Sequence, residues 1–468
     1  MIEHDRTANT AESAVQLRID KAVYGGAGLA RQQGKAVFVP YSLPGELVTA
    51  SVTREKTGFS EAALQSVLQP SPARAEPPCP YFGVCGGCHY QHASYEAQLE
   101  MKRAILGETL TRAGLGELPA IVTHAGQPWG YRSRIRLHID PSTSALGYWQ
   151  RGAHRLVLVD RCPIAAPVLE RALVHLDEVG RRQQWGGFFC EVELSVNHDG
   201  SELLLAFWLC TPVRADEASA RLQRLCDDLE QRLPSLRGAG VLAPQPLRQE
   251  QGRGSRHSRG GQRSGPRSAP ADDAPGALLS KWGVPDMTYQ VGTLAYRVSL
   301  GAFFQGNRTL VAELVTLATA GRSGLLAWDL YAGVGLFSRV LAGCFDKVIA
   351  VEGAPISFED LRFHLAAPHQ AVQASTLDFL RRQVGQGERG RPGFVLVDPP
   401  RAGLGPEVVS LLARSGPKDV TYVSCDPATF ARDLRGLVDS GYTLQQLHLI
   451  DLFPQTFHLE AVAMLSHP

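Results

Sequence analysis

The sequence predicts an α/β protein built from an N-terminal OB-like β-barrel, a central α/β region and a C-terminal doubly wound domain with a parallel sheet. Short strands and turns fill residues 15–73, which is typical of a small closed barrel. From residue 281 to 468, short apolar runs rich in β-branched residues alternate with helical stretches. This alternation indicates an open parallel sheet, whose ligands bind beyond the carboxyl ends of its strands.

Composition bounds the class of protein. The chain has 468 residues, of which 44% are hydrophobic and 20% charged, so it can bury a large core. Lys plus Arg is 47 and Asp plus Glu is 46, a net charge of +1 that excludes a globally basic nucleic-acid coat protein. No apolar run reaches the ~18 residues that a membrane span needs, and the N-terminus lacks a signal-peptide pattern. We therefore expect a cytoplasmic protein that does not bind a membrane, and we expect a monomer.

The N-terminal part is predicted to divide into a disordered tail over residues 1–14 and the barrel over residues 15–73. Gly25-Gly26 and Pro44-Gly45 separate runs of alternating apolar and polar residues, as turns between strands do. Lys and Arg modestly outnumber Asp and Glu in the barrel. On charge alone, contact with RNA and an ordinary solvated surface both remain open.

The central region spans residues 74–280. Ser94 is placed to cap a helix that runs to about residue 113. Residues 245–275 are rich in Gly, Ser, Pro and Arg and have few apolar side chains, which predicts a disordered insertion. Its arginines could bind nucleic-acid phosphates without reading the base sequence, or the insertion could serve as a passive spacer.

Three of the nine cysteines lie within ten residues, in the pattern Cys79-x5-Cys85-x2-Cys88. Cys162, in the tripeptide Arg-Cys-Pro, is the candidate for a fourth ligand. Zinc and iron–sulfur clusters both bind four thiolates. The tight spacing, the neighbouring prolines and the one distant ligand favour a cluster over zinc, in a structural role.

A glycine turn in the C-terminal domain points to a nucleotide-like cofactor. Asp329-Leu-Tyr-Ala-Gly-Val-Gly runs from a strand into a helix, and Glu352 closes the next strand, where a carboxylate can bind ribose hydroxyls. Dinucleotides and S-adenosylmethionine are both bound by a glycine turn and a carboxylate in this arrangement. Asp398-Pro-Pro-Arg, directly after another strand, is typical of S-adenosylmethionine-dependent methyltransferases that act on bases.

A cysteine and a carboxylate are predicted at the same sheet edge. Cys425 follows a strand, and Glu460 leads into the last one. An isolated cysteine is more often a core residue, but a strand end at the ligand crevice favours a nucleophile. Carbon 5 of uracil accepts a methyl group only after a thiolate has added to carbon 6, and a base must then remove the C5 proton.

With these motifs in place, the chain resembles the RNA uracil-5-methyltransferases that act on ribosomal RNA and form 5-methyluridine. The resemblance covers nearly the whole length. It implies a TRAM domain over residues 15–73, a class I methyltransferase fold and a [4Fe-4S] cluster on Cys79, Cys85, Cys88 and Cys162. It also implies residue roles: Cys425 as nucleophile, Glu460 as general base, and Gln305, Tyr331, Glu352 and Asp398 as contacts of S-adenosylmethionine. Phe303 is then expected to lie against the target base. For His458, a surface or packing role is favoured over orientation of the Glu460 loop.

The chain departs from the family pattern at Asp426, where asparagine is common; its charge is expected to raise the pKa of Cys425. Three alternatives remain. The first is the same chemistry on transfer RNA. The second is a DNA cytosine-5-methyltransferase, disfavoured because that family places its nucleophile in a Pro-Cys dipeptide and Ser424 precedes Cys425 here. The third is a non-catalytic RNA-binding iron–sulfur protein.

Overall fold

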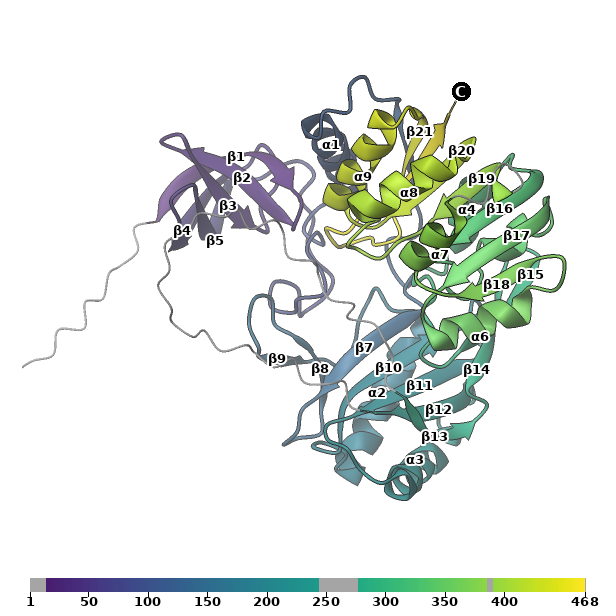
Figure 1. Ribbon diagram of the computed structural model, residues 1–468. Coiled ribbons are helices and arrows are strands. Elements are labelled where there is room, and N and C mark those ends of the chain that lie inside the picture. The colour runs from purple at the N-terminus through teal and green to yellow at the C-terminus, as the bar shows by residue number, and fades with distance from the viewer. Residues whose placement is uncertain (1–13, 244–276, 385–389, 468) are drawn as a thin grey trace, which may run out of the picture.

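The computed structural model describes residues 14–243, 277–384 and 390–467. Within these ranges the chain forms a barrel, a central α/β lobe and a C-terminal α/β lobe (Figure 1). The predicted tail, apart from residue 14, and the predicted insertion at 245–275 lie outside the described residues.

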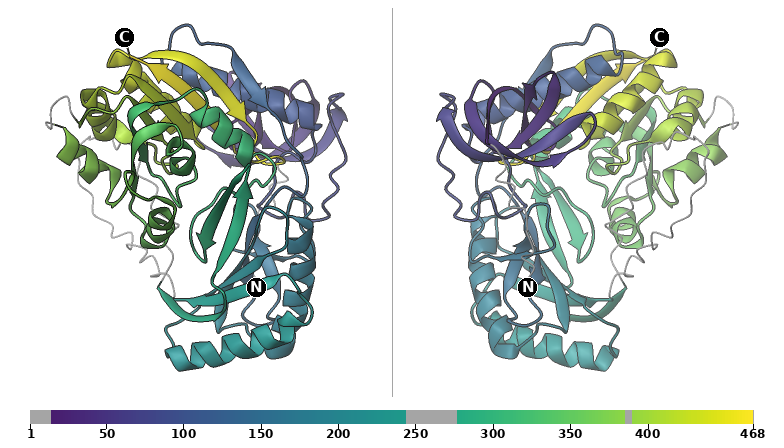
Figure 2. Two further views of the ribbon diagram at one scale, coloured as in Figure 1. Left: turned by 90° about the vertical axis from the view of Figure 1, so that its right-hand side faces the viewer. Right: turned by 90° about the vertical axis from the view of Figure 1, so that its left-hand side faces the viewer.

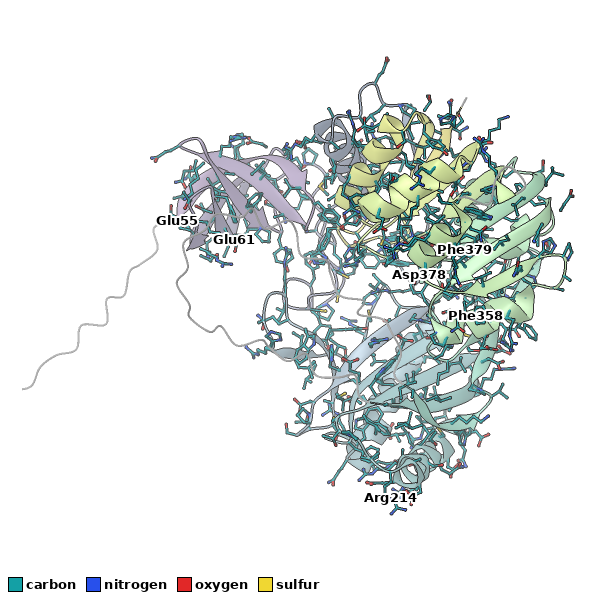
Figure 3. All side chains as sticks on the ribbon, in the orientation of Figure 1. Glu55, Glu61, Arg214, Phe358, Asp378 and Phe379 are labelled. Carbon is teal, nitrogen blue, oxygen red and sulfur yellow. The ribbon has the colours of Figure 1, made fainter. Side chains whose placement is uncertain are left out.

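The N-terminal barrel is closed, with strand order β1-β2-β3-β5-β4, which confirms the predicted barrel. Alternate residues point inward, and Leu17, Val37, Val39 and Val48 are at most 2% exposed. Figure 3 labels Glu55 and Glu61 on two of these strands. The strands are β1 (Val15–Val23), β2 (Ala27–Gln32), β3 (Lys35–Pro40), β4 (Leu47–Glu55) and β5 (Phe59–Gln69).

The central lobe is a seven-stranded sheet in the order β13-β12-β11-β10-β7-β8-β9, with two helices packed on one face. The hairpin β14–β15 packs against the other face of β11, so every residue of β11 is buried. The strands are β7 (Arg134–Ile139), β8 (Leu146–Trp149), β9 (Leu156–Leu158), β10 (Phe189–Val196), β11 (Leu203–Leu209), β12 (Leu236–Leu242) and β13 (Leu278–Gly283). The helices are α2 (Pro167–Gln183) and α3 (Ala215–Glu230), and the hairpin strands are β14 (Asp286–Val291) and β15 (Leu294–Ser299).

The C-terminal lobe is an eight-stranded sheet in the order β18-β17-β16-β19-β20-β22-β21-β6. The first five strands are parallel, and β22 lies antiparallel between β20 and β21. The predicted doubly wound sheet is thereby confirmed. The strands are β6 (Ile121–His124), β16 (Gly324–Leu330), β17 (Phe345–Glu352), β18 (Gln370–Gln373), β19 (Phe394–Val397), β20 (Asp419–Ser424), β21 (Thr443–Ile450) and β22 (Glu460–Ser466).

Helices and the hairpin cover both faces of this sheet. Helices α1, α7, α8 and α9 share one apolar core with it, and α4, α5 and the hairpin β14–β15 share the other. Figure 2 shows the hairpin between the central and C-terminal lobes. The helices are α1 (Tyr95–Arg112), α4 (Val311–Thr319), α5 (Ser338–Leu341), α6 (Pro355–His364), α7 (Thr376–Gln383), α8 (Gly405–Ser415) and α9 (Pro427–Asp439).

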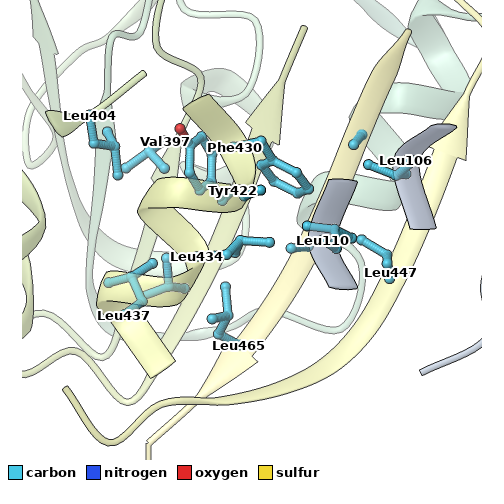
Figure 4. Packing of buried hydrophobic residues seen from close by; sticks show 14 of the residues in the cluster. Leu106, Leu110, Val397, Leu404, Tyr422, Phe430, Leu434, Leu437, Leu447 and Leu465 are labelled. Carbon is cyan, nitrogen blue, oxygen red and sulfur yellow. The ribbon is translucent and has the colours of Figure 1, made fainter. Parts of the chain in front are cut away.

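Two elements of the C-terminal lobe come from the N-terminal third of the chain. Helix α1 begins at the predicted cap, where Ser94 Oγ accepts a hydrogen bond from the Ala97 amide at 3.3 Å. Its Leu106 and Leu110 are fully buried beside Leu447 and Leu434 (Figure 4). Strand β6 pairs in parallel with β21 and closes that edge of the sheet.

No helix in the described ranges is long and apolar enough to cross a bilayer.

Candidate active site

The carboxyl ends of four neighbouring parallel strands meet at one edge of the C-terminal sheet. Tyr331 follows β16, Glu352 ends β17, Asp398 follows β19 and Cys425 follows β20. Ligands of open α/β sheets bind at this edge because the loops there diverge and leave a crevice. The structure therefore places these four predicted site residues along a single edge.

The pairing of β20 with β22 sets Cys425 against Glu460. Ser424 pairs with Ala461 in antiparallel register, so the next residue after β20 and the first residue of β22 are neighbours. The charge of the Glu460 carboxylate accordingly affects the Cys425 thiol directly. Glu460 is only 3% exposed, so its carboxyl group has little contact with bulk water. The predicted nucleophile and the predicted base thus lie side by side.

Burial and like charges disfavour the ionised forms of this pair. Burial raises the pKa of Cys425 far above its usual value, and the carboxylates of Glu460 and Asp398 raise it further. Burial also raises the pKa of Glu460 well above its usual value, again with a contribution from Asp398. The Arg401 guanidinium opposes both shifts. A bound cation would favour the ionised forms of both groups.

Asp398 connects this pair to the loop before α4. Gln305 Nε2 donates a hydrogen bond to Asp398 Oδ2 at 3.3 Å, and Gln305 is 7% exposed. Burial and the nearby Asp329 carboxylate raise the pKa of Asp398 to about 7. The structure thus joins Gln305, predicted from a loop motif, to a carboxylate predicted from a strand end.

The glycine turn after β16 has the backbone that the motif predicts. Gly333 and Gly335 have φ values of +55° and +94°, a region that favours glycine. The Gly333 amide donates to Glu352 Oε2 at 2.8 Å, and the Ala354 amide donates to Glu352 Oε1 at 2.6 Å. These contacts hold the Glu352 carboxylate at the turn. A Cβ at Gly333 would have no atom within 4 Å, so one side of the turn is open space.

Asp426 has two roles beside the nucleophile. Its Oδ1 accepts hydrogen bonds from the amides of Ala428 and Thr429 at 3.0 Å, which caps α9. Its charge also raises the pKa of Cys425, as predicted, although the contribution is smaller than that of burial. Asp426 therefore orders the segment that carries the thiol and disfavours the thiolate.

Two residues with no predicted role also reach this site. Arg401, from the loop after β19, contacts the ring of His458 at 3.4 Å. The position of Arg401 directly after Asp398-Pro-Pro could have predicted its presence at the site, because that loop lies at the ligand edge of the sheet. Tyr24, in the β1–β2 turn of the barrel, lies edge-on to Phe457 with ring centroids 5.2 Å apart. Nothing in the sequence around Tyr24 indicates that it crosses to another lobe.

His458 packs, as predicted. Its ring lies 4.2 Å from that of Phe457, centroid to centroid. Burial and the Arg401 charge lower the pKa of His458 to about 3, so the ring is neutral at physiological pH. A neutral, packed imidazole between an arginine and a phenylalanine supports the wall of the site.

The four predicted metal ligands line one cavity of about 470 Å³: Cys79, Cys85, Cys88 and Cys162. No disulfide joins them, and burial raises the pKa of Cys85 to about 11 and of Cys88 to about 12. In the described part of the chain, no three His, Cys, Asp or Glu side chains are arranged as a metal site. The thiols thus converge on one space without adopting ligand geometry.

The same cavity reaches the candidate active site. Phe303 and Gln305 line it together with the cysteines. Phe303 is 56% exposed, which is unusual for a phenylalanine and suits a side chain that stacks on a ligand.

Two family profiles match the chain. The profile described as "tRNA (Uracil-5-)-methyltransferase" matches residues 286–467, and that of the TRAM domain matches residues 15–64. An "Uncharacterized RNA methyltransferase" from Aquifex aeolicus is 32% identical, over 97% of this chain and 99% of its own length. The "23S rRNA (uracil(1939)-C(5))-methyltransferase RlmD" of Chromohalobacter salexigens is 34% identical, over 96% of this chain and 89% of its own. The chain belongs to the RNA uracil-5-methyltransferase family.

Membership in this family makes the protein an S-adenosylmethionine-dependent RNA (uracil-5-)-methyltransferase. A solved relative has the same fold: the Pyrococcus abyssi tRNA (uracil-54, C5)-methyltransferase in complex with S-adenosyl-L-homocysteine. It is 24% identical and superposes with a TM-score of 0.71, over 96% of this chain and 99% of its own. The enzyme thus combines the class I methyltransferase fold with an N-terminal TRAM barrel, and a non-catalytic RNA-binding role is disfavoured.

Proposed function

We propose that this enzyme methylates carbon 5 of a specific uridine in 23S ribosomal RNA through a transient bond between Cys425 Sγ and carbon 6. The observation that carries this proposal is the register of β20 and β22, which sets the buried Glu460 beside Cys425. A thiol and a carboxylate at the ligand edge of the sheet are the two groups that methylation of an inert pyrimidine carbon requires.

The first step belongs to Cys425. Its thiolate adds to carbon 6, the electron pair of the C5–C6 double bond moves to carbon 5, and carbon 5 becomes nucleophilic. A stacked base hides carbon 6, so the uridine must be flipped out of the RNA. The exposed Phe303, which lines the cavity, would then stack on it. S-adenosylmethionine, when bound, would supply its sulfonium methyl group to carbon 5, and the S–CH3 bond would break to leave S-adenosyl-L-homocysteine. Gln305, Tyr331, Glu352 and Asp398 would hold the cofactor.

The second step belongs to Glu460. Once carbon 5 carries both a methyl group and a proton, the Glu460 carboxylate removes that proton. The C5–C6 double bond re-forms and Sγ leaves carbon 6. The raised pKa of Glu460 makes its carboxylate a stronger base than an exposed one, which suits the removal of a proton from carbon.

Two substitutions test this chemistry. Cys425→Ala is expected to abolish transfer of labelled methyl groups into RNA that lacks the modification, while RNA binding persists. Cys344→Ala, at an exposed cysteine, is the matched control and should keep full activity. Glu460→Gln should accumulate a protein–RNA adduct that survives denaturing electrophoresis. Methyl transfer by Cys425→Ala would refute the nucleophile, and free RNA alone with Glu460→Gln would refute the base.

The choice of 23S ribosomal RNA rests on the curated relatives, which carry that substrate in their names at up to 34% identity. Transfer RNA is the second candidate, because the solved relative acts on it. Labelled methyl incorporation into unmodified 23S ribosomal RNA and unmodified transfer RNA, side by side, decides between them.

A [4Fe-4S] cluster on Cys79, Cys85, Cys88 and Cys162 is a further part of the proposal. Its support is the convergence of these four free thiols on one cavity. The charge of the half-buried Arg132 also acts to lower the pKa of Cys88 and of Cys162, which favours the thiolates of those two residues. Anaerobic reconstitution followed by iron and sulfide analysis tests it, with Cys85→Ser expected to lose iron and Cys344→Ser to retain it. Equal iron in the two variants would exclude the cluster.

The monomeric state and the cytoplasmic location of the protein stay predictions.

A further inference from the structure

We propose that helix α1 is the scaffold that positions the general base, with Gln98 and Lys102 as its positioning residues. The inference rests on the proposed role of Glu460 and adds residues far away in sequence. Glu460 stands at the end of the hairpin loop 451–459, where it pairs with Ile450 across the base of the loop. The placement of Glu460 therefore depends on what fixes this loop.

Lys102 anchors the beginning of the loop. Its Nζ lies 2.6 Å from Asp451 Oδ1 and donates to the Phe453 carbonyl at 2.9 Å. Both side chains of the ion pair are 0% exposed. A buried ion pair holds one geometry closely, because either charge without its partner is strongly disfavoured in the interior.

Gln98 anchors the middle of the loop. Its Oε1 accepts from the Gln455 amide at 2.9 Å, and its Nε2 donates to Gln455 Oε1 at 3.0 Å and to the Ala93 carbonyl at 3.0 Å. Gln98 is 1% exposed, so water cannot replace these partners. Gln455 has a φ of +68°, which a residue with a side chain adopts only when its surroundings impose it.

The contacts of this loop come largely from the N-terminal half of the chain. The amides of His89 and Tyr90 donate to the Gln455 carbonyl at 2.8 and 2.9 Å, and the Tyr131 hydroxyl donates to the Pro454 carbonyl at 3.0 Å. Helix α1 is itself fixed on the sheet by the apolar contacts of Leu106 and Leu110 (Figure 4). Helix α1 thus holds the beginning and the middle of the loop that leads to Glu460.

The discriminating variant is Gln98→Met, which keeps side-chain length and removes the hydrogen bonds to the loop. A displaced base slows proton removal, so turnover should fall by roughly 10- to 100-fold, as a shift of about 1 Å at a reacting group does. Adduct formation precedes proton removal, so its single-turnover rate should stay within about twofold of wild type. The covalent protein–RNA adduct should therefore accumulate, as with Glu460→Gln. Glu100→Met, at an exposed site on the same helix, is the matched control.

A role in stability alone would lower both rates together, because it removes folded enzyme. If Glu460→Gln traps the adduct and Gln98→Met loses turnover without trapping it, the positioning role is overturned while the proposed function stands. If neither variant traps the adduct, the base assignment itself fails. Amide hydrogen exchange over residues 451–459 gives a readout independent of activity. We expect faster exchange in Gln98→Met, and exchange equal to wild type would refute the anchor.

Lys102 needs a variant that does not leave a buried charge, because Lys102→Met alone risks unfolding. The double variant Lys102→Met/Asp451→Asn removes both charges and is expected to accumulate the adduct as well. Arg103→Met, exposed and adjacent, is the control. Wild-type turnover in the folded double variant would show that Lys102 does not position the base.

Discussion

At the scale of single residues, the feature that governs this site is a cluster of acidic groups, of which Glu460 is buried and Asp398 and Cys425 are half-buried. Asp398, Glu460 and the Cys425 thiol lie together, and each has a raised pKa chiefly because of burial. Such a site is unfavourable for anions and favourable for a cation. This electrostatic character fits a methyl donor that carries its charge on sulfur.

Asp398 predicts a measurable pH dependence of stability. Its pKa of about 7 in the folded protein exceeds the ~3.9 of an unfolded aspartate, so the folded state binds more protons between these values. Stability of the ligand-free protein therefore falls as pH rises from about 4 to about 7. Asp398→Asn cannot ionise, so the variant should gain stability relative to wild type across this window. Urea unfolding at pH 5 and pH 8 measures it, and an equal difference at both pH values would contradict the assignment.

At the scale of elements, the strand–turn–helix after β16 shows why particular glycines stand in the cofactor motif. Gly335 has a φ of +94°, and a Cβ there would lie 2.9 Å from Leu361 Cδ1. The turn thus combines a backbone conformation reserved for glycine with close packing on α6. These constraints fix the amide of Gly333, which orients Glu352.

Gly335→Ala should weaken S-adenosylmethionine binding at least about tenfold and lower the free energy of unfolding by roughly 1–3 kcal/mol, the typical strain at such a position. Calorimetric titration and urea unfolding measure the two effects. Gly116→Ala, where a Cβ meets no atom within 4 Å, is the control and should match wild type. Wild-type affinity in Gly335→Ala would show that the turn tolerates a side chain.

Elements with a strong local signal were predictable, and those defined by distant pairing were not. The alternation of β1–β5, the Ser94 cap and the apolar runs of β16, β17, β19 and β20 each carry their own pattern. Strand β6 has four residues and no distinctive pattern, and only its pairing with β21 makes it a strand. The same holds at the site. Cys425 and Glu460 lie in recognisable motifs, whereas Gln98, Lys102 and Tyr24 matter through contacts that sequence spacing does not encode.

At the scale of the whole molecule, the barrel is docked on the C-terminal lobe beside α1 rather than tethered at a distance (Figure 1). Ala22 and Leu43 of the barrel belong to the same apolar core as α1 and α9, and Lys21 pairs with Glu108 on α1. Tyr24 also contacts Phe457, which lies near the end of the hairpin loop 451–459 that leads to Glu460. The barrel is therefore part of the wall of the active site.

Tyr24→Ala should lower turnover several-fold while RNA affinity changes by less than about twofold, because it removes a contact to the base loop. Tyr24→Phe keeps the ring contact and should retain most of the activity. Phe38→Ala removes a ring contact within the barrel, to Phe59, and serves as the control. Steady-state methylation and filter binding of RNA separate the two effects. A loss of affinity equal to the loss of turnover would assign Tyr24 to RNA binding instead.

The edge strand β6 has a consequence for how such a protein can be divided or recombined. The segment matched by the methyltransferase profile begins at residue 286, yet the sheet it forms is completed by residues 121–124 and covered by α1. A fragment cut at that point would expose the backbone of β21 and leave Asp451 without Lys102, inviting edge-to-edge self-association. The C-terminal lobe is thus not expected to fold as an isolated fragment. Fusions and truncations should keep the N-terminal third of the chain intact.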